Sequence, residues 1–328
     1  MNRIPRKLRE QCSKQKAPGF VALMKAVLSD QAFDDDGWLF ERKLDGVRCL
    51  AINNGKKTTL YSRNRKRLNR TYPEIVTAVE ALPGRFAVDC ELVTFHKGLT
   101  SFAKLQRRMQ EKDPDEKLRR AVPVHAYVFD IIHLDGYNTE QLPLRERKKL
   151  LKAAFRFQTP LHYLPHRNAA GKKYHREACK KGWEGVIAKA AHSPYQRKRS
   201  RQWLKLKCTN GQELIICGYT EPEGKRTGFG ALLLGYYDSD KLCYAGRVGT
   251  GFDEDLLTRL HRRMAQMKRR SCPFDDFEGS EKDVTWVTPK LVAEIGFTEW
   301  TRDGKLRHPR FLGLREDKAP EDVVKEEP

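Results

Sequence analysis

The sequence predicts an α+β protein in which a mixed α/β domain is followed by a small β-barrel of the OB type. The chain has 328 residues, a length that suits about two domains. Hydrophobic residues make up 39% of it and charged residues 33%, so packed cores are expected rather than disorder. The pattern changes near residue 210, where alternating strands and helices give way to short strands between glycine-rich turns. We therefore expect domains at residues 1–210 and 211–328.

In the first domain, strands are predicted where short apolar or β-branched runs lie between turn residues. The expected strands are residues 38–42, 47–52, 58–61, 86–95 and 124–132. Residues 144–155 carry apolar side chains at roughly helical spacing, and residues 174–181 end at a glycine, so both segments are predicted to be helices.

The second domain is predicted to be mostly β-structure. Its expected strands are residues 214–219, 231–237, 241–248 and 291–300. Residues 253–268 form an amphipathic helix between them. Four or five short strands with one intervening helix are typical of a small Greek-key barrel. The acidic tail, residues 316–328, is expected to be poorly ordered at its end.

The charge of the chain indicates a polyanionic partner. Lys and Arg number 64 against 43 for Asp and Glu, which gives a formal net charge of +21. Such an excess favours a nucleic-acid partner. The charge alone is equally compatible with basic solubility or non-specific adhesion. A basic protein that binds nucleic acid without catalysis is a further alternative.

Several other classes are excluded by the sequence. No apolar run approaches the ~20 residues that a membrane span needs, and residues 1–15 lack the apolar core of a secretory signal. The eight cysteines contain no CxxC pair, which excludes a zinc finger of the usual spacing. Scattered cysteines are typical of reduced, buried thiols, so we expect no disulfide and a cytoplasmic location.

Residues 41–48 form the most informative segment, with the sequence ERKLDGVR. An ordinary charged hairpin is one interpretation, since Asp45-Gly46 is a common turn pair. The functional interpretation places Lys43 at the end of an apolar strand. An exposed lysine with a pKa of ~10.4 is protonated at neutral pH. Partial burial and neighbouring cations would lower the pKa of Lys43 and make its amine a nucleophile.

Further segments, taken in order with residues 43–48, resemble the motifs of covalent nucleotidyltransferases, the superfamily of ATP-dependent DNA ligases, RNA ligases and capping enzymes. They are KLDGVR at 43–48, SRN at 62–64, DCEL at 89–92, YVFDII at 127–132, EGVIAK at 184–189 and WLKLK at 203–207. The sequences RHP at 307–309 and REDK at 315–318 resemble the last motif of bacterial ligase D. The resemblance implies an adenylation (nucleotidyltransferase) domain followed by an OB-fold domain.

The resemblance also implies roles for individual residues. Lys43 would attack the α-phosphorus of ATP to form a lysyl-adenylate, and the other expected catalytic residues are Lys205, Lys207, Asp317 and Lys318. The expected ATP-binding residues are Glu41, Arg48, Arg63, Glu91 and Phe129, together with Lys205 and Lys207. Lys205 and Lys207 alternate with apolar residues, so a strand would present both on one face.

Two further groups are expected to bind ions or DNA. Glu184 and Glu91 would bind Mg²⁺ or Mn²⁺, because hard cations prefer carboxylate oxygens. The basic residues Arg197, Lys198, Arg199 and Arg201 would contact the DNA backbone, which fixes position without reading sequence.

The resemblance therefore implies an ATP-dependent DNA ligase of the ligase D type. It would join 5′-phosphate and 3′-hydroxyl ends in nicked or broken duplex DNA through lysyl-adenylate and DNA-adenylate intermediates, in end joining or nick sealing. The expected setting is a monomer at the bacterial nucleoid, with Ku as a partner. An RNA ligase or a capping-type nucleotidyltransferase is the enzymatic alternative, and the REDK sequence favours DNA.

Overall fold

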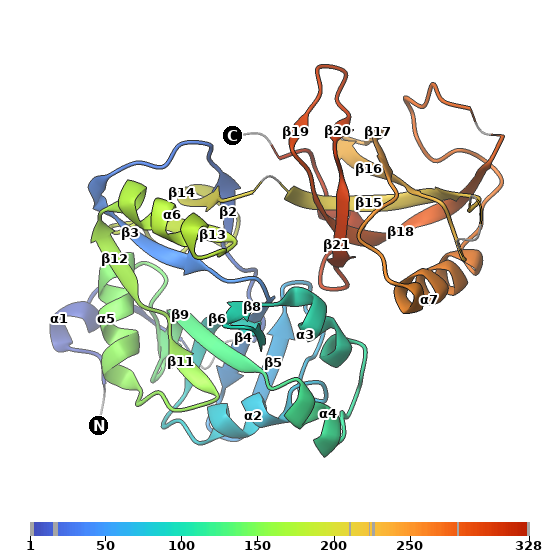
Figure 1. Cartoon of the computed structure of the whole chain (residues 1–328). Coiled ribbons are helices and arrows are strands. Elements are labelled where there is room, and N and C mark those ends of the chain that lie inside the picture. Colours follow the sequence, from blue (N-terminus) through green and yellow to red (C-terminus); the bar gives the residue numbers. More distant parts are fainter. Residues whose placement is uncertain are drawn as a thin grey trace. The chain divides into compact units, whose positions relative to one another are not determined.

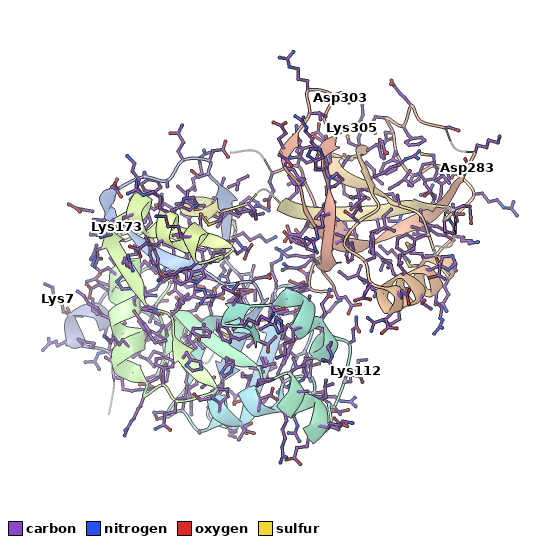
Figure 2. All side chains as sticks on the ribbon, viewed as in Figure 1. Lys7, Lys112, Lys173, Asp283, Asp303 and Lys305 are labelled. Carbon is purple, nitrogen blue, oxygen red and sulfur yellow. A yellow bond between two sulfur atoms is a disulfide. The ribbon has the colours of Figure 1, made fainter. Side chains whose placement is uncertain are left out.

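The computed structural model describes residues 3–15, 19–209, 211–222, 224, 227–280 and 282–326. The chain divides into two compact units, Met1–Cys208 and Thr209–Glu327 (Figure 1). Each unit has its own hydrophobic clusters. Charged side chains such as Lys7, Lys112 and Lys173 extend outward from the first unit, as the basic composition predicts (Figure 2).

The first unit contains two main sheets. In the described residues the larger sheet has seven strands, and every pairing in it is antiparallel except that between β11 and β9. Its strands, in spatial order, are β1 (Ser13–Lys14), β10 (Tyr137–Asn138), β9 (His125–Leu134), β6 (Phe86–Val93), β4 (Val47–Asn53) and β5 (Thr58–Ser62), with β11 (Leu161–Tyr163) also beside β9.

The smaller sheet has five strands within the described residues. In spatial order they are β12 (His166–Ala169), β3 (Asp35–Lys43), β13 (Gly185–Ala190), β14 (Arg199–Lys207) and β2 (Lys25–Leu28). β14 and β2 run parallel, and the other pairs are antiparallel. A short hairpin, β7 (Phe95–His96) and β8 (Leu99–Thr100), follows β6. The strands expected in this domain are all present.

Helices cover the outer faces of both sheets. α5 (Leu144–Ala154) packs against β9, and α6 (Gly171–Lys180) packs against β13 and β3 (Figure 1). Both were predicted. The remaining helices of this unit were not predicted, and they are α1 (Arg6–Arg9), α2 (Pro73–Glu80), α3 (Phe102–Met109) and α4 (Glu116–Ala121). Local signals mark three of them: Pro73 begins α2, while Ser101 and Asp115 cap α3 and α4.

Alternation along the strands separates a helix-covered core from a second core that includes residues of both sheets. On β6 the side chains of Phe86, Val88 and Cys90 join the helix-covered cluster. Ala87 and Val93, on the opposite face, belong to a cluster that also contains Trp203 of the smaller sheet. The inner faces of the two sheets therefore share one core, and polar residues on those faces are held between apolar neighbours.

The second unit is built on one antiparallel sheet. Its strands, in spatial order, are β17 (Lys241–Val248), β16 (Leu232–Asp238), β15 (Gly211–Thr220), β18 (Val284–Gly296) and β21 (Arg310–Leu314). The order places the fourth strand beside the first, as in a Greek key. α7 (Glu254–Ala265) buries Leu257, Leu260 and Met264 in the core. A hairpin, β19 (Glu299–Trp300) and β20 (Leu306–Arg307), and the 3₁₀ turn Pro320–Asp322 complete the unit.

The predicted OB-type Greek-key order is present, but strand pairing does not close the barrel in the described residues, because the edge strands β17 and β21 share no ladder. After Val248 the chain turns at residues 249–251, where Gly251 has a φ of +96° and leaves the extended conformation. A main-chain hydrogen bond of 2.9 Å from Phe311 to the oxygen of Thr250 connects the edges instead. The five strands therefore form an open sheet and not a closed ring of paired strands.

Two local predictions also need correction. The strand expected at 291–300 begins earlier, at Val284, and ends at Gly296. Pro289 is tolerated inside it because it lies in a bulge where β18 does not pair with β15. The expected disorder at the end of the tail falls partly on residues 327–328, outside the described residues. The part before them is packed: Val323 is 4% exposed and its oxygen accepts a hydrogen bond from Tyr237.

The expectation that no disulfide forms is wrong. Cys179 of α6 and Cys208, just after β14, are joined by a disulfide although they are 29 residues apart. The reason is tertiary: β13 pairs with β14 and α6 packs on β13, so the ends of α6 and β14 meet. The remaining cysteines are free thiols. No helix in the described ranges is long and apolar enough to cross a membrane.

Candidate active site

Lys43 is the last residue of β3, and strand pairing places it in one row with a second lysine, two strands away. Gly185 of β13 pairs with Lys43 on one side and with Lys207 on the other. In the next row on the same face, Ile187 pairs with Glu41 and Lys205. Directly opposed residues and residues two positions apart point to the same side of a sheet. Lys43, Lys205 and Lys207 therefore share one face, as predicted for the last two.

This face is the one that shares a core with the larger sheet. The third row contains Leu39, Lys189 and Trp203. The ring of Trp203 lies 6.2 Å from that of Phe129 on β9, edge to face. Phe129 is 6% exposed and belongs to the same cluster as Trp203. Phe129 thus borders the face that carries the lysines, where an aromatic ring could stack on a base.

The amine of Lys43 contacts the carboxylate of Glu184, which lies 141 positions later and directly precedes β13. Their side chains are 18% and 26% exposed, so both are partly shielded from water but accessible. The second carboxylate oxygen of Glu184, Oε2, is buried and has no hydrogen-bond partner. A buried oxygen left without a donor suits a ligand to a hard cation, so Glu184 fits the metal-binding role expected of it.

Arg48 and Glu91 are directly paired across β4 and β6. The guanidinium of Arg48 makes a bidentate contact with Asp89, at 2.5 and 2.6 Å, and donates to the main-chain oxygen of Met24 at 3.2 Å. Burial alone would lower the pKa of Arg48, but Asp89 raises it above its ordinary value. Arg48 also lies over the ring of Phe129, 4.7 Å from its centroid. Asp89, which we did not predict as a site residue, therefore fixes Arg48 in place.

Glu41, an expected ATP-binding residue, is buried inside the first unit. Its side chain is 1% exposed and its carboxylate contacts the amines of Lys148 and Lys189. Burial alone would raise the pKa of Glu41, but the two ammonium groups lower it below its ordinary value. Both oxygens of Glu41 thus hold lysines of the same domain, and we interpret Glu41 as a residue that positions them.

Lys189 is a second residue at this face that we did not predict, besides Asp89. Its amine lies 4.0 Å from the ring centroids of both Phe129 and Trp203. Burial and the nearby Lys148 lower the pKa of Lys189 to about 8, although Glu41 acts to raise it. A signal was present, because a lysine at the end of the apolar run EGVIAK is unexpected in a buried strand. Lys148 lies on the basic helix α5, and nothing in that helix distinguishes it from its neighbours.

The predicted DNA-binding residues do not form one uniform group. Arg197, Lys198, Arg199 and Arg201 are all exposed. Arg197, however, donates to both carboxylate oxygens of Glu140, at 2.9 and 3.0 Å. Arg199 donates to the main-chain oxygen of Ala26 at 3.2 Å. Arg63 follows β5 and is half-buried, away from this run in the sequence.

Asp317 and Lys318 are held by ion pairs within the second unit. Asp317 is 5% exposed and receives two hydrogen bonds of 3.0 Å from Arg315. Burial alone would raise the pKa of Asp317, but Arg315 lowers it below its ordinary value. The amine of Lys318 lies 2.7 Å from the carboxylate of Glu213 on β15. The predicted catalytic pair is therefore anchored to the sheet of its own unit.

Comparisons with known proteins cover both units. Residues 21–207 match the family model described as ATP dependent DNA ligase domain, and residues 225–318 match that described as ATP dependent DNA ligase C terminal region. The multifunctional non-homologous end joining protein LigD of Pseudomonas aeruginosa is 34% identical over 300 residues, which are 89% of this chain and 35% of that protein. The corresponding protein of Mycobacterium tuberculosis is 36% identical over 297 residues, which are 88% and 37%.

A solved structure is also similar over both units. The structure of a mycobacterial DNA ligase D complexed with ATP and MES has a TM-score of 0.66 and 32% identity. The match covers 93% of this chain and 98% of that one. In contrast, the chain spans only about a third of the length of the curated relatives it matches.

Proposed function

The chain belongs to the family of ATP-dependent DNA ligases, and from this premise we propose that it joins 5′-phosphate and 3′-hydroxyl ends in duplex DNA with ATP as co-substrate. The observation that carries the proposal is the position of Lys43. Its amine contacts Glu184, and Lys207 follows in the same strand row. A nucleophilic amine next to further cations on one face suits an attack on a phosphate.

Three displacements at phosphorus follow from this arrangement. The amine of Lys43, once deprotonated, attacks the α-phosphorus of ATP; the N–P bond forms, the bond to pyrophosphate breaks, and the nitrogen releases one proton. A DNA 5′-phosphate oxygen then attacks the adenylate, and the Lys43 amine leaves. Finally the 3′-hydroxyl attacks the adenylated 5′-phosphate, AMP leaves, and the backbone is continuous.

The residues of the inner face support the first displacement. Lys205 and Lys207 point to the same side as Lys43 and would offset charge that develops on the α-phosphate. Phe129 would stack on the adenine. Glu184, with Glu91, would hold Mg²⁺ or Mn²⁺, which when bound neutralises phosphate charge. The free Oε2 of Glu184 supports this assignment.

The biological setting is a further part of the proposal. Because the curated relatives are named as non-homologous end joining proteins, we infer that broken duplex DNA at the bacterial nucleoid is the substrate. Ku would be the partner that delivers the ends, and the chain would act as a monomer. The exposed residues Lys198, Arg199 and Arg201 would contact the DNA backbone.

The test is transfer of radiolabelled AMP from ATP to the protein in the presence of magnesium. Wild type should form a covalent protein–AMP band, and Lys43→Ala should form none. Lys56→Ala, which removes an exposed lysine in the turn after β4, is the matched control and should behave as wild type. A Lys43→Ala protein that still forms protein–AMP would overturn the assignment.

Two further measurements test which step of ligation needs Lys43 and whether the protein acts in end joining. Lys43→Ala should still seal a nick that is already adenylated, because the amine acts as nucleophile only in the first step. Sealing of nicked and blunt-ended duplexes by wild type, each with and without Ku, then tests the end-joining role. Stimulation of blunt-end joining by Ku is the expected result, and equal rates would contradict that role.

A further inference from the structure

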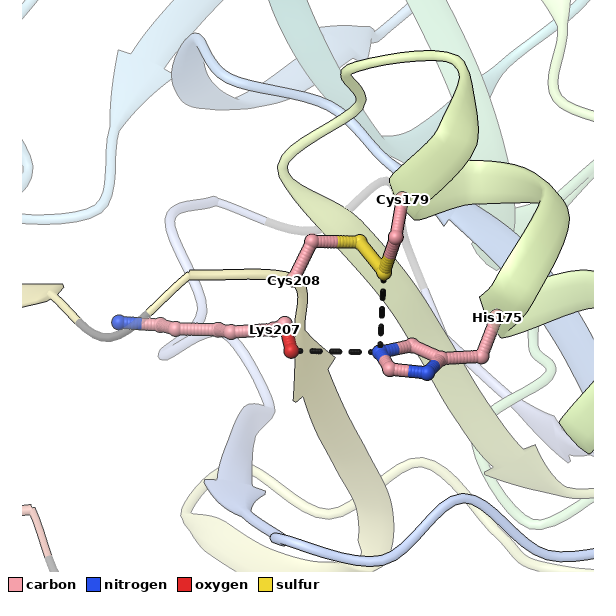
Figure 3. Close-up of a disulfide and its surroundings, with 4 residues drawn as sticks. All are labelled: His175, Cys179, Lys207 and Cys208. Carbon is pink, nitrogen blue, oxygen red and sulfur yellow. Dashed lines mark hydrogen bonds between the residues drawn. A yellow bond between two sulfur atoms is a disulfide. The ribbon is translucent and has the colours of Figure 1, made fainter. Parts of the chain in front are cut away.

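A cysteine pair lies at the end of the strand that carries Lys207. Cys179 is on the last turn of α6 and Cys208 directly follows β14, and their sulfurs are bonded (Figure 3). Both residues are half-buried, so a small solute can reach them. Their Cα atoms are 5.2 Å apart. By contrast, Cys49, Cys90 and Cys217 are free and buried.

A histidine contacts the same pair. Nε2 of His175 lies 3.6 Å from Sγ of Cys179 and 3.2 Å from the main-chain oxygen of Lys207 (Figure 3). A carbonyl oxygen can only accept, so Nε2 carries its one hydrogen and donates it to Lys207, while the same nitrogen lies beside the sulfur. The thiolate is the form of cysteine that attacks a disulfide, and polar neighbours favour it. Cys179 provides the sulfur of the pair that contacts the imidazole.

The pair is connected to the residues of the proposed active site through the main chain. The N–H of Cys208 donates to the oxygen of Glu184 at 3.0 Å. The residue before Cys208 is Lys207, whose oxygen accepts the bond from His175. Cys208 is also the last residue of the first unit, so the bond fixes the point from which the chain enters the second unit.

We propose that His175, Cys179 and Cys208 form a reversible thiol–disulfide site, and that the oxidised form holds Lys207 and Glu184 in place for the first step of ligation. The inference rests on the proposed function for its effect on activity, although the redox site itself is independent of that function. When the bond is reduced, the end of β14 loses its covalent link to α6 and is held by strand pairing and packing. A catalytic group held less firmly contributes less to the rate.

The oxidant is a low-molecular-weight disulfide such as glutathione disulfide. The Cys179 thiolate attacks one of its sulfurs, the glutathione S–S bond breaks, and one glutathione thiolate leaves. The Cys208 thiolate then attacks the Cys179 sulfur of the mixed disulfide, and the second glutathione leaves. The two protein thiols thus lose two electrons and two protons, and one glutathione disulfide becomes two glutathione molecules.

The experiment equilibrates the full chain at graded ratios of glutathione to glutathione disulfide. Blocking of free thiols and peptide mapping then measure the fraction of Cys179 linked to Cys208. Single-turnover formation of protein–AMP is measured on the same samples. We expect the linked fraction to rise with oxidant and fall again with dithiothreitol, and the adenylation rate of the oxidised protein to be at least threefold that of the reduced protein.

Single-residue variants distinguish the effect of the Cys179–Cys208 bond from that of oxidation elsewhere in the protein. Cys208→Ser and Cys179→Ser should adenylate at the rate of reduced wild type in every buffer. Cys243→Ser, which removes a half-buried thiol of the second unit, should respond to oxidant as wild type does. His175→Ala should form the disulfide more slowly.

The results that would overturn the proposal are distinct from those that would overturn the ligase function. A Cys179–Cys208 link that never forms, or equal adenylation rates in both forms, overturns the redox site. So does one equivalent of zinc in the purified wild type that is lost in Cys208→Ser. Absence of protein–AMP in both forms would instead refute the proposed function, and the mapped disulfide would still test the redox site.

Discussion

Lys43 and Lys207 lie in one transverse row of the smaller sheet with only Gly185 between them. The glycine is required by the backbone. A Cβ at this position would lie 2.1 Å from the main-chain oxygen of Leu206, and the φ of Gly185 is +152°. Any side chain would therefore push β13 away from β14 and change the spacing of the two lysines.

Gly185→Ala should lower the single-turnover rate of protein–AMP formation at least tenfold. It should also lower the free energy of unfolding by about 1–3 kcal/mol, the usual range for a strained backbone position. Gly19→Ala is the control, because a Cβ there has no atom within 4 Å. An unchanged rate in Gly185→Ala would show that the spacing of Lys43 and Lys207 does not matter for adenylation.

Asp317→Asn and Lys318→Ala should lower adenylation at least tenfold more than they lower sealing of a pre-adenylated nick. The reason is that the resemblance of residues 315–318 to the last ligase motif implies a role for this pair in orienting pyrophosphate, which leaves in the first step alone. Rates of both steps are measured in single turnover. Lys241→Ala, which removes an exposed lysine of the same unit, is the control.

The ion pairs of Asp317 and Lys318 also predict that the two variants differ in stability. Asp317→Ala removes the bidentate partner of the buried Arg315 and leaves it the longer contact with Glu294 at 3.5 Å, so the loss in unfolding free energy should stay below the about 3–5 kcal/mol of a fully unpaired buried charge. Lys318→Ala breaks a more exposed pair and should destabilise less. If both variants slow the two steps equally, the pair has a structural role only.

Removal of Lys198, Arg199 and Arg201 together should weaken DNA binding and make it less dependent on salt. Each lost phosphate contact reduces the slope of log affinity against log salt by about 0.9. Binding of a nicked duplex at four salt concentrations measures the slope. We expect a reduction of up to about 3 and little change in adenylation.

Two controls test the assignment of that basic run. Arg197→Ala should leave the slope nearly unchanged, because Glu140 already engages its guanidinium. Alanine at Lys172, Lys173 and Arg176 removes three exposed charges from α6 and should have a smaller effect. An unchanged slope in the triple variant of residues 198, 199 and 201 would mean that this run does not contact DNA.

The lowered pKa of Lys189 predicts that the stability of the protein depends on pH. Its pKa is about 8 in the folded protein and near 10.5 when unfolded. Between these values the unfolded chain binds a proton that the folded protein does not, so the contribution of Lys189 to stability rises with pH, by about 1.4 kcal/mol per pH unit at most. Below pH 8 the contribution is constant.

The measurement is the free energy of unfolding from pH 7 to 10.5, as the difference between wild type and Lys189→Met. This difference should increase in favour of wild type above pH 8. Lys152→Met removes an exposed lysine of α5 and should give a flat difference. A flat profile for Lys189→Met would show that the amine is not perturbed.

The sequence by itself determined which residues are candidates for the chemistry. Lys43, Glu184 and Lys207 are identified because their segments resemble ligase motifs, and the shared face of Lys205 and Lys207 follows from a period of two. These properties depend only on near neighbours in the chain. The signals for helix starts at Pro73, Ser101 and Asp115 are equally local.

Only the tertiary structure decided which residues meet. Strand register brings Glu184 to Lys43 and Gly185 between two lysines, and a one-residue shift in register would exchange the faces. The same long-range packing buries Glu41 against Lys148 and, against expectation, joins Cys179 to Cys208. Local composition cannot specify such pairings, because their free energy comes from contacts between segments far apart in the chain.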